Sequence, residues 1–427
     1  MALHQDTIWE VRTGGNNENG GGFHNRVPGT SVDYTFQNAP QLDLTDIACA
    51  GAGVTTITSV VGGFTAAMVG NIIKFHAGAN FLTEFFEIVT VNSVNSVDLD
   101  RTPATGVGAN GHGKVGGGQV NCDLLDSVVV PGNTIYIENG IYAAHPSITF
   151  TDTFTRSLPL TIEGYNTLRG TRPTGNNRPV IRMGGNTITF KGFTKTSNIS
   201  FEGTGDPIIT WVASGSNVGP AYFFTNCKFT NLASVGASSC IRLLNSPSNA
   251  DNLLLIDCEF LGTAGAASYG VQDKAAGNTL YVSVLNCYFH NLTVGVYILA
   301  VNSDLNIAFS IFAVCSYGVI GGNTTACRIT NCTFDSISID GFASGGVGTT
   351  FINNNFSNCV NAGINSQASV VMYNNFFGNG NNWIGGTLNP VDNNTFIAPQ
   401  FVTPGSNYAL QRTSGLIDRA FSMRLGV

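Results

Sequence analysis

Residues Asn226 to Phe229 read Asn-Cys-Lys-Phe, and they are the first of eight four-residue motifs that each end in Phe. Successive closing residues are separated by 31, 29, 23, 22, 22, 20 and 20 positions. These residues are Phe229, Phe260, Phe289, Phe312, Phe334, Phe356, Phe376 and Phe396. Self-similarity at such a regular period is the signature of a repeat architecture, so the sequence predicts a solenoid.

The intervals between the motifs contain short apolar runs that Gly and Asn interrupt, such as residues 281–285 and 295–299. Runs of this length that are rich in Val, Ile and aromatic residues are typical of strands separated by turns. The shorter intervals, of 20–23 residues, suffice for one rung of three such strands. We therefore expect an all-β fold, a right-handed single-stranded parallel β-helix with a small N-terminal β-rich domain.

Side chains alternate along a strand, so positions two and four of each motif are expected to point into the solenoid and positions one and three outward. Position two carries only small residues, which suits a place beside a column of stacked Phe rings. These residues are Cys227, Cys258, Cys287, Ser310, Cys332, Asn354, Asn374 and Asn394. We expect the Asn side chains to form an interior amide ladder and the Cys side chains to pack as compact apolar thiols.

The composition excludes several functions. Only 11% of the residues are charged and the net charge is −7, so a chain without basic runs is unsuited to nucleic acid. No apolar run approaches the about 20 residues of a membrane span, and the N-terminus lacks the pattern of a signal peptide. The ten Cys have no metal-ligand spacing, and buried thiols suit a reducing compartment. We expect no metal, no cofactor and no export.

The sequence predicts four segments. Residues 1–53 are a Gly/Asn-rich N-terminal arm, and residues 54–121 are a small β-rich head domain followed by a Gly-rich linker. Residues 122–396 form the parallel β-helix. Residues 397–427 are a C-terminal capping segment, which we expect to cover the last rung and prevent edge-to-edge pairing.

Several segments resemble known families. Residues 132–142, 160–165 and 198–203 resemble the first rungs of pectate-lyase-like β-helices, and residues 398–401 and 407–410 resemble the closing segment of that superfamily. Residues 7–12, the Gly/Asn-rich stretch 13–23 and residues 63–71, placed before a β-helix, resemble bacteriophage virion surface proteins such as tail spikes and fibres. This resemblance implies a homotrimer on the virion exterior, attached to other virion proteins through its N-terminal region. The fold itself implies no activity.

An enzyme of this fold would act through carboxylates on an outer face. Asp257 and Glu259, at positions one and three of the second motif, are the only such carboxylate pair in the eight motifs. Two residues along a strand lie about 6.5–7 Å apart, near the separation found in inverting glycosidases. Lys228, Tyr288 and His290 would complete a sugar-binding cleft. The alternative is a surface ion pair between Glu259 and Lys228.

Three further side chains are candidates for ligand contact. Trp211 lies in the longer loops of residues 204–225 and 230–252, where it would stack on a sugar ring or, alternatively, pack in the interior. Arg169 and Arg172 lie in a Pro/Gly/Asn-rich excursion between the first rungs. They would bind an acidic sugar or a neighbouring subunit's carboxylates, or stay solvated.

Two functions are open at this point. The first is a structural protein exposed on the surface of a tailed-phage virion, as a tail spike, fibre or head decoration that contacts host surface glycan. The second is a polysaccharide depolymerase, a glycosidase or lyase, on the same β-helix. The N-terminal arm and head domain, the missing export signal and the scarcity of acidic clusters favour the first.

Overall fold

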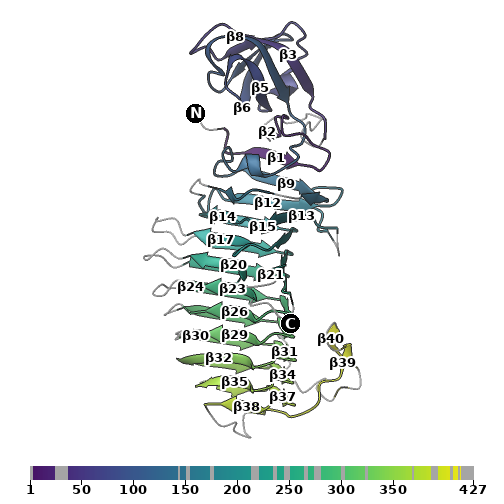
Figure 1. Ribbon diagram of the computed structural model, residues 1–427, viewed down its shortest axis with the longest axis vertical. Coiled ribbons are helices and arrows are strands. Elements are labelled where there is room, and N and C mark those ends of the chain that lie inside the picture. Colours follow the sequence, from purple (N-terminus) through teal and green to yellow (C-terminus); the bar gives the residue numbers. More distant parts are fainter. Residues whose placement is uncertain are drawn as a thin grey trace, which may run out of the picture. The chain divides into compact units, whose positions relative to one another are not determined.

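The structure is a computed structural model of the chain. It describes residues 3–24, 37–142, 145–150, 154–173, 177–212, 221–233, 238–244, 251–263, 268–273, 280–299, 303–322, 326–367, 370–385, 393–403, 407–411 and 414. The chain divides into two compact units, Met1–Arg182 with Gly192–Ile199 and Met183–Lys191 with Ser200–Val427. Each is built from strands, as predicted (Figure 1).

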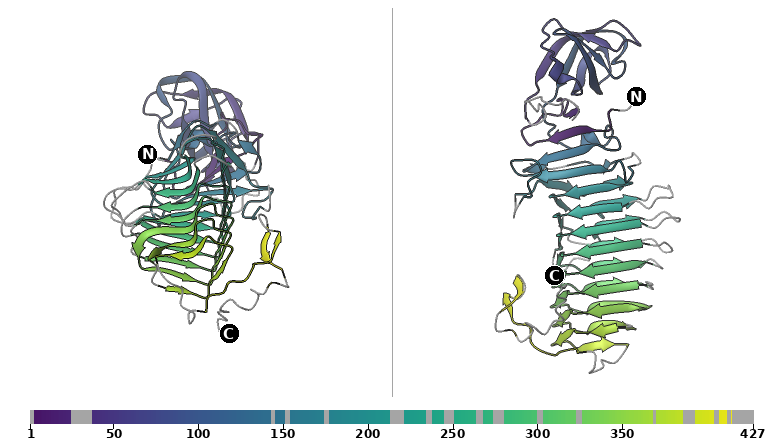
Figure 2. Two further views of the ribbon diagram at one scale, coloured as in Figure 1. Left: turned by 60° about the horizontal axis from the view of Figure 1, so that its bottom comes forward. Right: turned by 180° about the vertical axis from the view of Figure 1, so that it is seen from behind.

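The second unit is a stack of parallel strands in three sheets (Figures 1 and 2). The first sheet contains β18 (Ala221–Thr225), β21 (Asp251–Ile256), β24 (Leu280–Leu285), β27 (Asp304–Ala308), β30 (Ala326–Thr330), β33 (Thr349–Ile352) and β36 (Val370–Met372). The second contains β16 (Ser200–Gly203), β19 (Lys228–Asn231), β22 (Glu259–Leu261), β25 (Tyr288–His290), β28 (Ile311–Ala313), β31 (Thr333–Asp335), β34 (Asn355–Ser357) and β37 (Asn375–Phe377). The third contains β14 (Ile188–Lys191), β17 (Ile209–Val212), β20 (Ser238–Leu244), β23 (Ser268–Asp273), β26 (Val294–Ile298), β29 (Tyr317–Gly321), β32 (Asp340–Val347), β35 (Ala362–Gln367) and β38 (Asn381–Ile384).

Within the second unit each strand pairs in parallel with the strand three places later in the chain, so every rung adds one strand to each sheet. The register joins equivalent motif residues, for example Phe260 with Phe289 and Phe289 with Phe312. This is the right-handed parallel β-helix that the Phe spacing predicted.

The Phe residues of motif position four form one interior stack, which Phe201 of β16 extends by one rung. Consecutive rings from Phe201 to Phe376 have centroids 4.5–5.5 Å apart and planes within 14° of parallel. Each ring is at most 1% exposed. The eighth motif differs, because Phe396 is 57% exposed and lies beyond β37, the last strand of its sheet. The prediction that Phe396 points inward is therefore wrong.

Motif position two is buried from Cys227 to Asn374, as predicted, and its Asn side chains form the expected amide ladder. Asn354 Oδ1 accepts from the backbone N of Cys332 at 2.9 Å, and Asn374 Oδ1 accepts from the backbone N of Asn354 at 2.9 Å. Asn394 Oδ1 accepts from the backbone N of Asn374 at 2.9 Å. All ten cysteines of the chain are buried free thiols.

Motif position one is a bend residue, and the expectation of an outward strand position is wrong. All eight of these residues have left-handed backbone, with φ between 52° and 59°. They are Asn226, Asp257, Asn286, Phe309, Asn331, Asn353, Tyr373 and Asn393. Asn and Asp tolerate this conformation better than other residues with a Cβ, which explains why they fill six of the eight places. We call this set the first bend.

The first unit contains a closed barrel with the strand order β3-β4-β7-β6-β5-β8. Its elements are β3 (Leu42–Cys49), β4 (Thr56–Thr58), the short 3₁₀ helix η1 (Ala66–Met68), β5 (Ile72–Phe81), β6 (Phe85–Ser93), β7 (Ser96–Leu99) and β8 (Ala104–Val115). The barrel encloses a continuous apolar core that includes Ile47, Ile73, Phe75 and Phe86. The head domain thus begins earlier than expected, and the predicted Gly-rich linker is strand β8 in its larger part.

The rest of the first unit begins a solenoid. Its strands are β1 (Thr7–Val11), β2 (Gly22–His24), β9 (Thr134–Glu138), β10 (Ile141–Tyr142), β11 (Ile148–Thr149), β12 (Leu160–Tyr165), β13 (Val180–Gly184) and β15 (Thr194–Ser197), with the 3₁₀ helix η2 (Asp123–Leu125). β1 pairs in parallel with β9 and antiparallel with β2. The N-terminal segment is therefore partly built into the sheet, which corrects the expectation that residues 1–53 form an irregular arm.

The C-terminal segment forms an antiparallel hairpin of β39 (Phe401–Thr403) and β40 (Asn407–Leu410). Phe401 and Tyr408 pack on Ala313 of β28 within the second unit. The hairpin therefore covers the outer face of β28, whereas Ile397, at the start of the predicted capping segment, bonds through its backbone N and O to the side chain of Asn375 in the last rung. Residues 415–427 lie outside the described residues.

Candidate functional site

The outer face of β19, β22 and β25 carries a charged cluster, which we call the Glu259 cluster (Lys228, Glu259 and His290). Parallel pairing places Lys228, Glu259 and Tyr288 side by side on successive rungs. Lys228 Nζ lies 3.2 Å from Glu259 Oε1, and His290 Nε2 lies 3.1 Å from the same oxygen. The Glu259 side chain is 31% exposed, so the cluster is half-buried and open to solvent.

These partners keep Glu259 ionised. The hydrogen bond from His290 and the charge of Lys228 lower the pKa of Glu259 from 4.5 to about 2, although burial opposes the shift. A general acid must hold a proton near neutral pH, which requires a raised pKa. Glu259 therefore does not meet the requirement for the acid of an inverting pair.

Asp257 does not belong to this cluster. It is a first-bend residue with φ of 55°, and its Oδ1 accepts a hydrogen bond of 2.6 Å from Asn286 Nδ2 on the next rung. The bend thus turns Asp257 out of the strand alternation on which the predicted carboxylate pair was based. The hypothesis that Asp257 and Glu259 flank a scissile bond loses its geometric basis.

Tyr288 connects the Glu259 cluster to the C-terminal hairpin. Its ring stacks on the His290 imidazole, with centroids 4.3 Å apart and planes at 6°. The same ring also contacts Tyr408 of the hairpin, with the two centroids 6.3 Å apart in an edge-on arrangement. Tyr288, Ile311 and Leu410 surround the buried contact of the hairpin with β28. An apolar strip therefore follows the charged cluster along this face.

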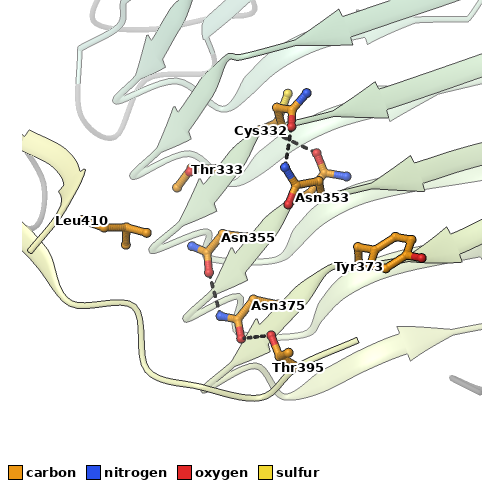
Figure 3. Close-up of a pocket in the computed structure, with 10 residues that line it drawn as sticks. Cys332, Thr333, Asn353, Asn355, Tyr373, Asn375, Thr395 and Leu410 are labelled. Carbon is orange, nitrogen blue, oxygen red and sulfur yellow. Dashed lines mark hydrogen bonds between the residues drawn. The ribbon is translucent and has the colours of Figure 1, made fainter. Parts of the chain in front are cut away.

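The same face ends in a pocket of about 190 Å³ (Figure 3). Ten residues line it: Asn331, Cys332, Thr333, Asn353, Asn354, Asn355, Tyr373, Asn375, Thr395 and Leu410. None of these ten is charged. The volume is below the range typical of sites for drug-sized ligands, and it suits one small polar unit.

Hydrogen bonds between rungs hold the pocket's amides in place (Figure 3). Asn375 Nδ2 donates to Asn355 Oδ1 at 2.8 Å, and Thr395 Oγ1 donates to Asn375 Oδ1 at 3.0 Å. On the first bend, Asn353 Nδ2 donates to Asn331 Oδ1 at 2.5 Å. The amide of Asn375 is fully used, because its Nδ2 also donates to the carbonyl oxygen of Ile397 at 2.9 Å and its Oδ1 also accepts from Ile397 N at 2.9 Å. The amides of Asn353 and Asn355 can make further hydrogen bonds, because each has two donor hydrogens and an acceptor oxygen. The pocket thus presents fixed, neutral hydrogen-bonding groups.

Sequence reasoning missed this pocket. Its signal is present in the third motif position, which changes from charged residues in the early rungs to Thr333, Asn355, Asn375 and Thr395 in the late rungs. The pocket also needs Leu410 from the hairpin, and local motifs give no indication of where that segment docks.

Trp211 lies inside the second unit. It is 2% exposed, and its ring centroid is 4.3 Å from that of Tyr222. Interior packing, one of the two alternatives, is therefore what the structure shows, and a direct ligand contact by Trp211 is wrong. Parts of the two loops expected near it, residues 213–220, 234–237 and 245–250, lie outside the described residues.

Arg169 has a partner within its own chain. Arg169 Nη2 lies 2.5 Å from Oε2 of Glu10, whose side chain is fully buried, and the guanidinium covers the ring of Tyr136 at 4.8 Å. Arg12 Nη1 lies 3.1 Å from Oε1 of the same carboxylate. Arg169 therefore contributes to the stability of the first unit, and its charge is engaged by Glu10 rather than available to an acidic sugar. Arg172 is exposed.

The described residues contain no group of three or more His, Cys, Asp or Glu side chains arranged to hold a metal ion. In the same residue ranges, no helix has the length and apolar character needed to cross a membrane.

No protein-family model matches the sequence, and no curated protein matches it. Among solved structures, the chain is similar to the native GH136 lacto-N-biosidase from Eubacterium ramulus, with 9% identity over 66% of this chain and 64% of that chain and a TM-score of 0.43. The chain thus spans just under two thirds of that enzyme's length.

Two further similarities are to the catalytic domain of a GH87 alpha-1,3-glucanase in complex with nigerose and to the tailspike protein gp49 from Pseudomonas phage LKA1. The glucanase has 13% identity over 85% of this chain and 91% of that chain, with a TM-score of 0.31. The tailspike has 11% identity over 80% of this chain and 63% of that chain, with a TM-score of 0.23. At these identities and TM-scores, none of the three assigns an activity to this chain.

Proposed function

We propose that the chain is a surface protein of a tailed-phage virion that binds a neutral polysaccharide of the host envelope through the outer face of its second unit. The observation that carries the proposal is the uncharged, amide-lined pocket on that face. Fixed amide and hydroxyl groups beside an aromatic ring are the chemistry that recognises sugar hydroxyls and the apolar face of a sugar ring.

The composition supports a neutral ligand. Only 11% of the residues are charged, and the net charge of −7 would repel an acidic polymer. An acidic polysaccharide would need cations along its path. Lys228 lies on this face, but its charge is already engaged by Glu259. The pocket is therefore better suited to a neutral glycan than to a polyuronate.

The location on a virion and a homotrimeric state belong to the same proposal. They are supported by the N-terminal motifs that resemble phage virion surface proteins, and by the arrangement of a barrel in the chain before the regular solenoid. Other virion proteins would contact the N-terminal region. Immunolabelling of purified particles tests the location, and the absence of this chain from particles would contradict it. Sedimentation equilibrium of the purified chain tests for the trimer.

Binding is tested by biolayer interferometry on immobilised neutral polysaccharides: dextran, levan, galactomannan and xyloglucan. The wild-type chain should bind at least one of them. The substitution Asn355→Leu keeps the heavy-atom branching of a pocket side chain but replaces its amide by two larger methyl groups, and it should weaken that binding. The matched control is Asn381→Leu, which alters an exposed amide that does not line the pocket. Equal loss in both variants would contradict the assignment of the pocket.

A second candidate function is depolymerisation, and one observation favours it. The His290 imidazole lies on the outer face, and its hydrogen bond to the Glu259 carboxylate fixes its orientation, as proton transfer from or to a substrate requires. Incubation with the same polysaccharides, followed by assays for new reducing ends and unsaturated uronates, tests this candidate. Cleavage that Glu259→Gln and His290→Gln abolish would establish it, and intact polymer would exclude it for these substrates.

A further inference from the structure

Two aromatic residues interrupt the Asn and Asp series of the first bend. They are Phe309 and Tyr373, with φ of 54° and 59°. The bend backbone is the same in all eight rungs, so the aromatic residues are not required by a different geometry. Some other property must explain why these two rungs depart from Asn.

The left-handed conformation is unfavourable for both aromatic residues. Asn and Asp offset part of that cost because their short side chains form local hydrogen bonds, which Phe lacks. Burial does not compensate Phe309 either, because its side chain is 62% exposed. Residues held in sparsely populated backbone regions cluster at ligand sites, and an observed outlier of this kind justifies a hypothesis of function.

The two aromatic residues lie at the two ends of a short column. Phe309, Asn331, Asn353 and Tyr373 occupy the first bend in four consecutive rungs, and we call them the bend ladder. Adjacent rungs are about 4.8 Å apart, so the bend ladder extends over about 14 Å. Asn331, Asn353 and Tyr373 also line the pocket, which makes the ladder continuous with it (Figure 3).

We infer that the bend ladder is an extended oligosaccharide-binding strip, with Phe309 as a stacking platform beyond the pocket. This inference rests on the proposed function and specifies its ligand as a chain of sugar units that follows the solenoid axis. The aromatic rings at the two ends stack on sugar rings, and the two amides between them bond to hydroxyl groups. A single sugar unit would fill the pocket without reaching Phe309.

The test uses the most common residue of the bend itself. Phe309→Asn removes the ring and restores the side chain found in the neighbouring rungs, so the variant should fold and its Tm should rise by about 1–2 °C. Its affinity for the polysaccharide that binds the wild type should fall by about threefold to tenfold. Tyr373→Asn should show the same loss of affinity.

Val314 supplies a matched control. It is an exposed apolar residue, 51% accessible, with φ of 54° at the bend that follows β28. The equivalent residues of neighbouring rungs, Asn291, Ser336 and Asn358, also have positive φ. Val314→Asn should therefore raise Tm as Phe309→Asn does, while leaving the affinity for polysaccharide unchanged.

The outcomes separate this inference from the proposed function. Retained affinity in Phe309→Asn, together with loss in the pocket variant Asn355→Leu, overturns the bend ladder alone. Equal loss in Phe309→Asn and Val314→Asn also overturns it, because relief of bend strain would then be the cause. If the wild-type chain binds none of the four polysaccharides, both the proposed function and the ladder are overturned. Loss in Phe309→Asn with full affinity in Val314→Asn supports the inference.

Discussion

Asn374 Oδ1 accepts two hydrogen bonds from Asn354, one from the backbone N and one from Nδ2, each at 2.9 Å. Asn374 Nδ2 donates in turn to the carbonyl oxygens of Phe351 at 3.0 Å and Met372 at 2.9 Å. One buried amide thus satisfies backbone groups of two rungs. This makes the interior ladder a structural device, and the ladder adjoins the pocket at Asn354, which also lines it.

We expect Asn374→Ala to lower the free energy of unfolding by about 2–4 kcal/mol, because it leaves buried backbone groups without partners. Asn381→Ala is the control, since that exposed amide makes one 3.1 Å bond to the carbonyl of Asn361. Its effect should stay within about 0.5 kcal/mol. Urea denaturation of both variants measures the difference. Equal midpoints would show that the ladder contributes no stability.

The Phe stack gives a second pair of variants. Phe289 is fully buried between Phe260 and Phe312, at centroid distances of 4.5 and 4.8 Å. Phe289→Ala should cost about 3–5 kcal/mol because it removes a large core side chain and leaves a cavity. Phe396→Ala removes the same atoms from an exposed position and should cost less than about 0.5 kcal/mol. Similar losses would contradict the exposed placement of Phe396.

The space around two glycines of the barrel region predicts the effects of a third pair of variants. A Cβ on Gly111 would lie 2.7 Å from the Phe81 ring, whereas a Cβ on Gly51 would meet no atom within 4 Å. Gly111→Ala should therefore lower the free energy of unfolding by about 1–3 kcal/mol through overpacking. Gly51→Ala should be close to neutral. Thermal unfolding of the two variants distinguishes them, and a neutral Gly111→Ala would show that Phe81 does not fill this space.

Glu259 predicts a pH dependence of stability. Its folded-state pKa of about 2 lies below the ordinary value of 4.5, so the ionised carboxylate contributes stability that is present in full above pH 4.5. That contribution is lost as the pH falls toward about 2. In Glu259→Gln, the urea midpoint should change less across this window than in the wild type. Lys228→Met removes a positive charge that lowers the pKa of Glu259, so the urea midpoint of this variant should also change less across the window than that of the wild type. Parallel curves for wild type and Glu259→Gln would contradict the ion-pair geometry.

The repeating part of the fold was predictable because its rules are local. The period of the Phe residues fixes the rungs, and the small residues beside them, such as Cys258 and Asn354, identify the inward column. The bend at position one also has a local signal, because the frequent Asn and Asp there are residues that tolerate positive φ. Strand alternation alone does not contain this signal, and it therefore paired Asp257 with Glu259 wrongly.

The non-repeating parts depend on distant contacts. β1 forms a strand because it pairs with β9, more than a hundred residues later in the chain. β8 is a strand despite its many glycines, because Gly108 and Gly111 leave room for the Phe81 ring. The pocket requires Leu410 to reach rungs formed much earlier in the sequence. Local patterns carry no information about such pairings.

The most direct measurement is the affinity of the wild-type chain and of Asn355→Leu for the four immobilised neutral polysaccharides. It is made at low salt and at about 1 M NaCl, because charge interactions are screened beyond about 3 Å at the higher concentration. A neutral glycan held by amides and an aromatic ring should bind the wild type equally well at both salt concentrations, and Asn355→Leu should bind more weakly at both. Absence of binding, or binding that high salt abolishes, would contradict the account.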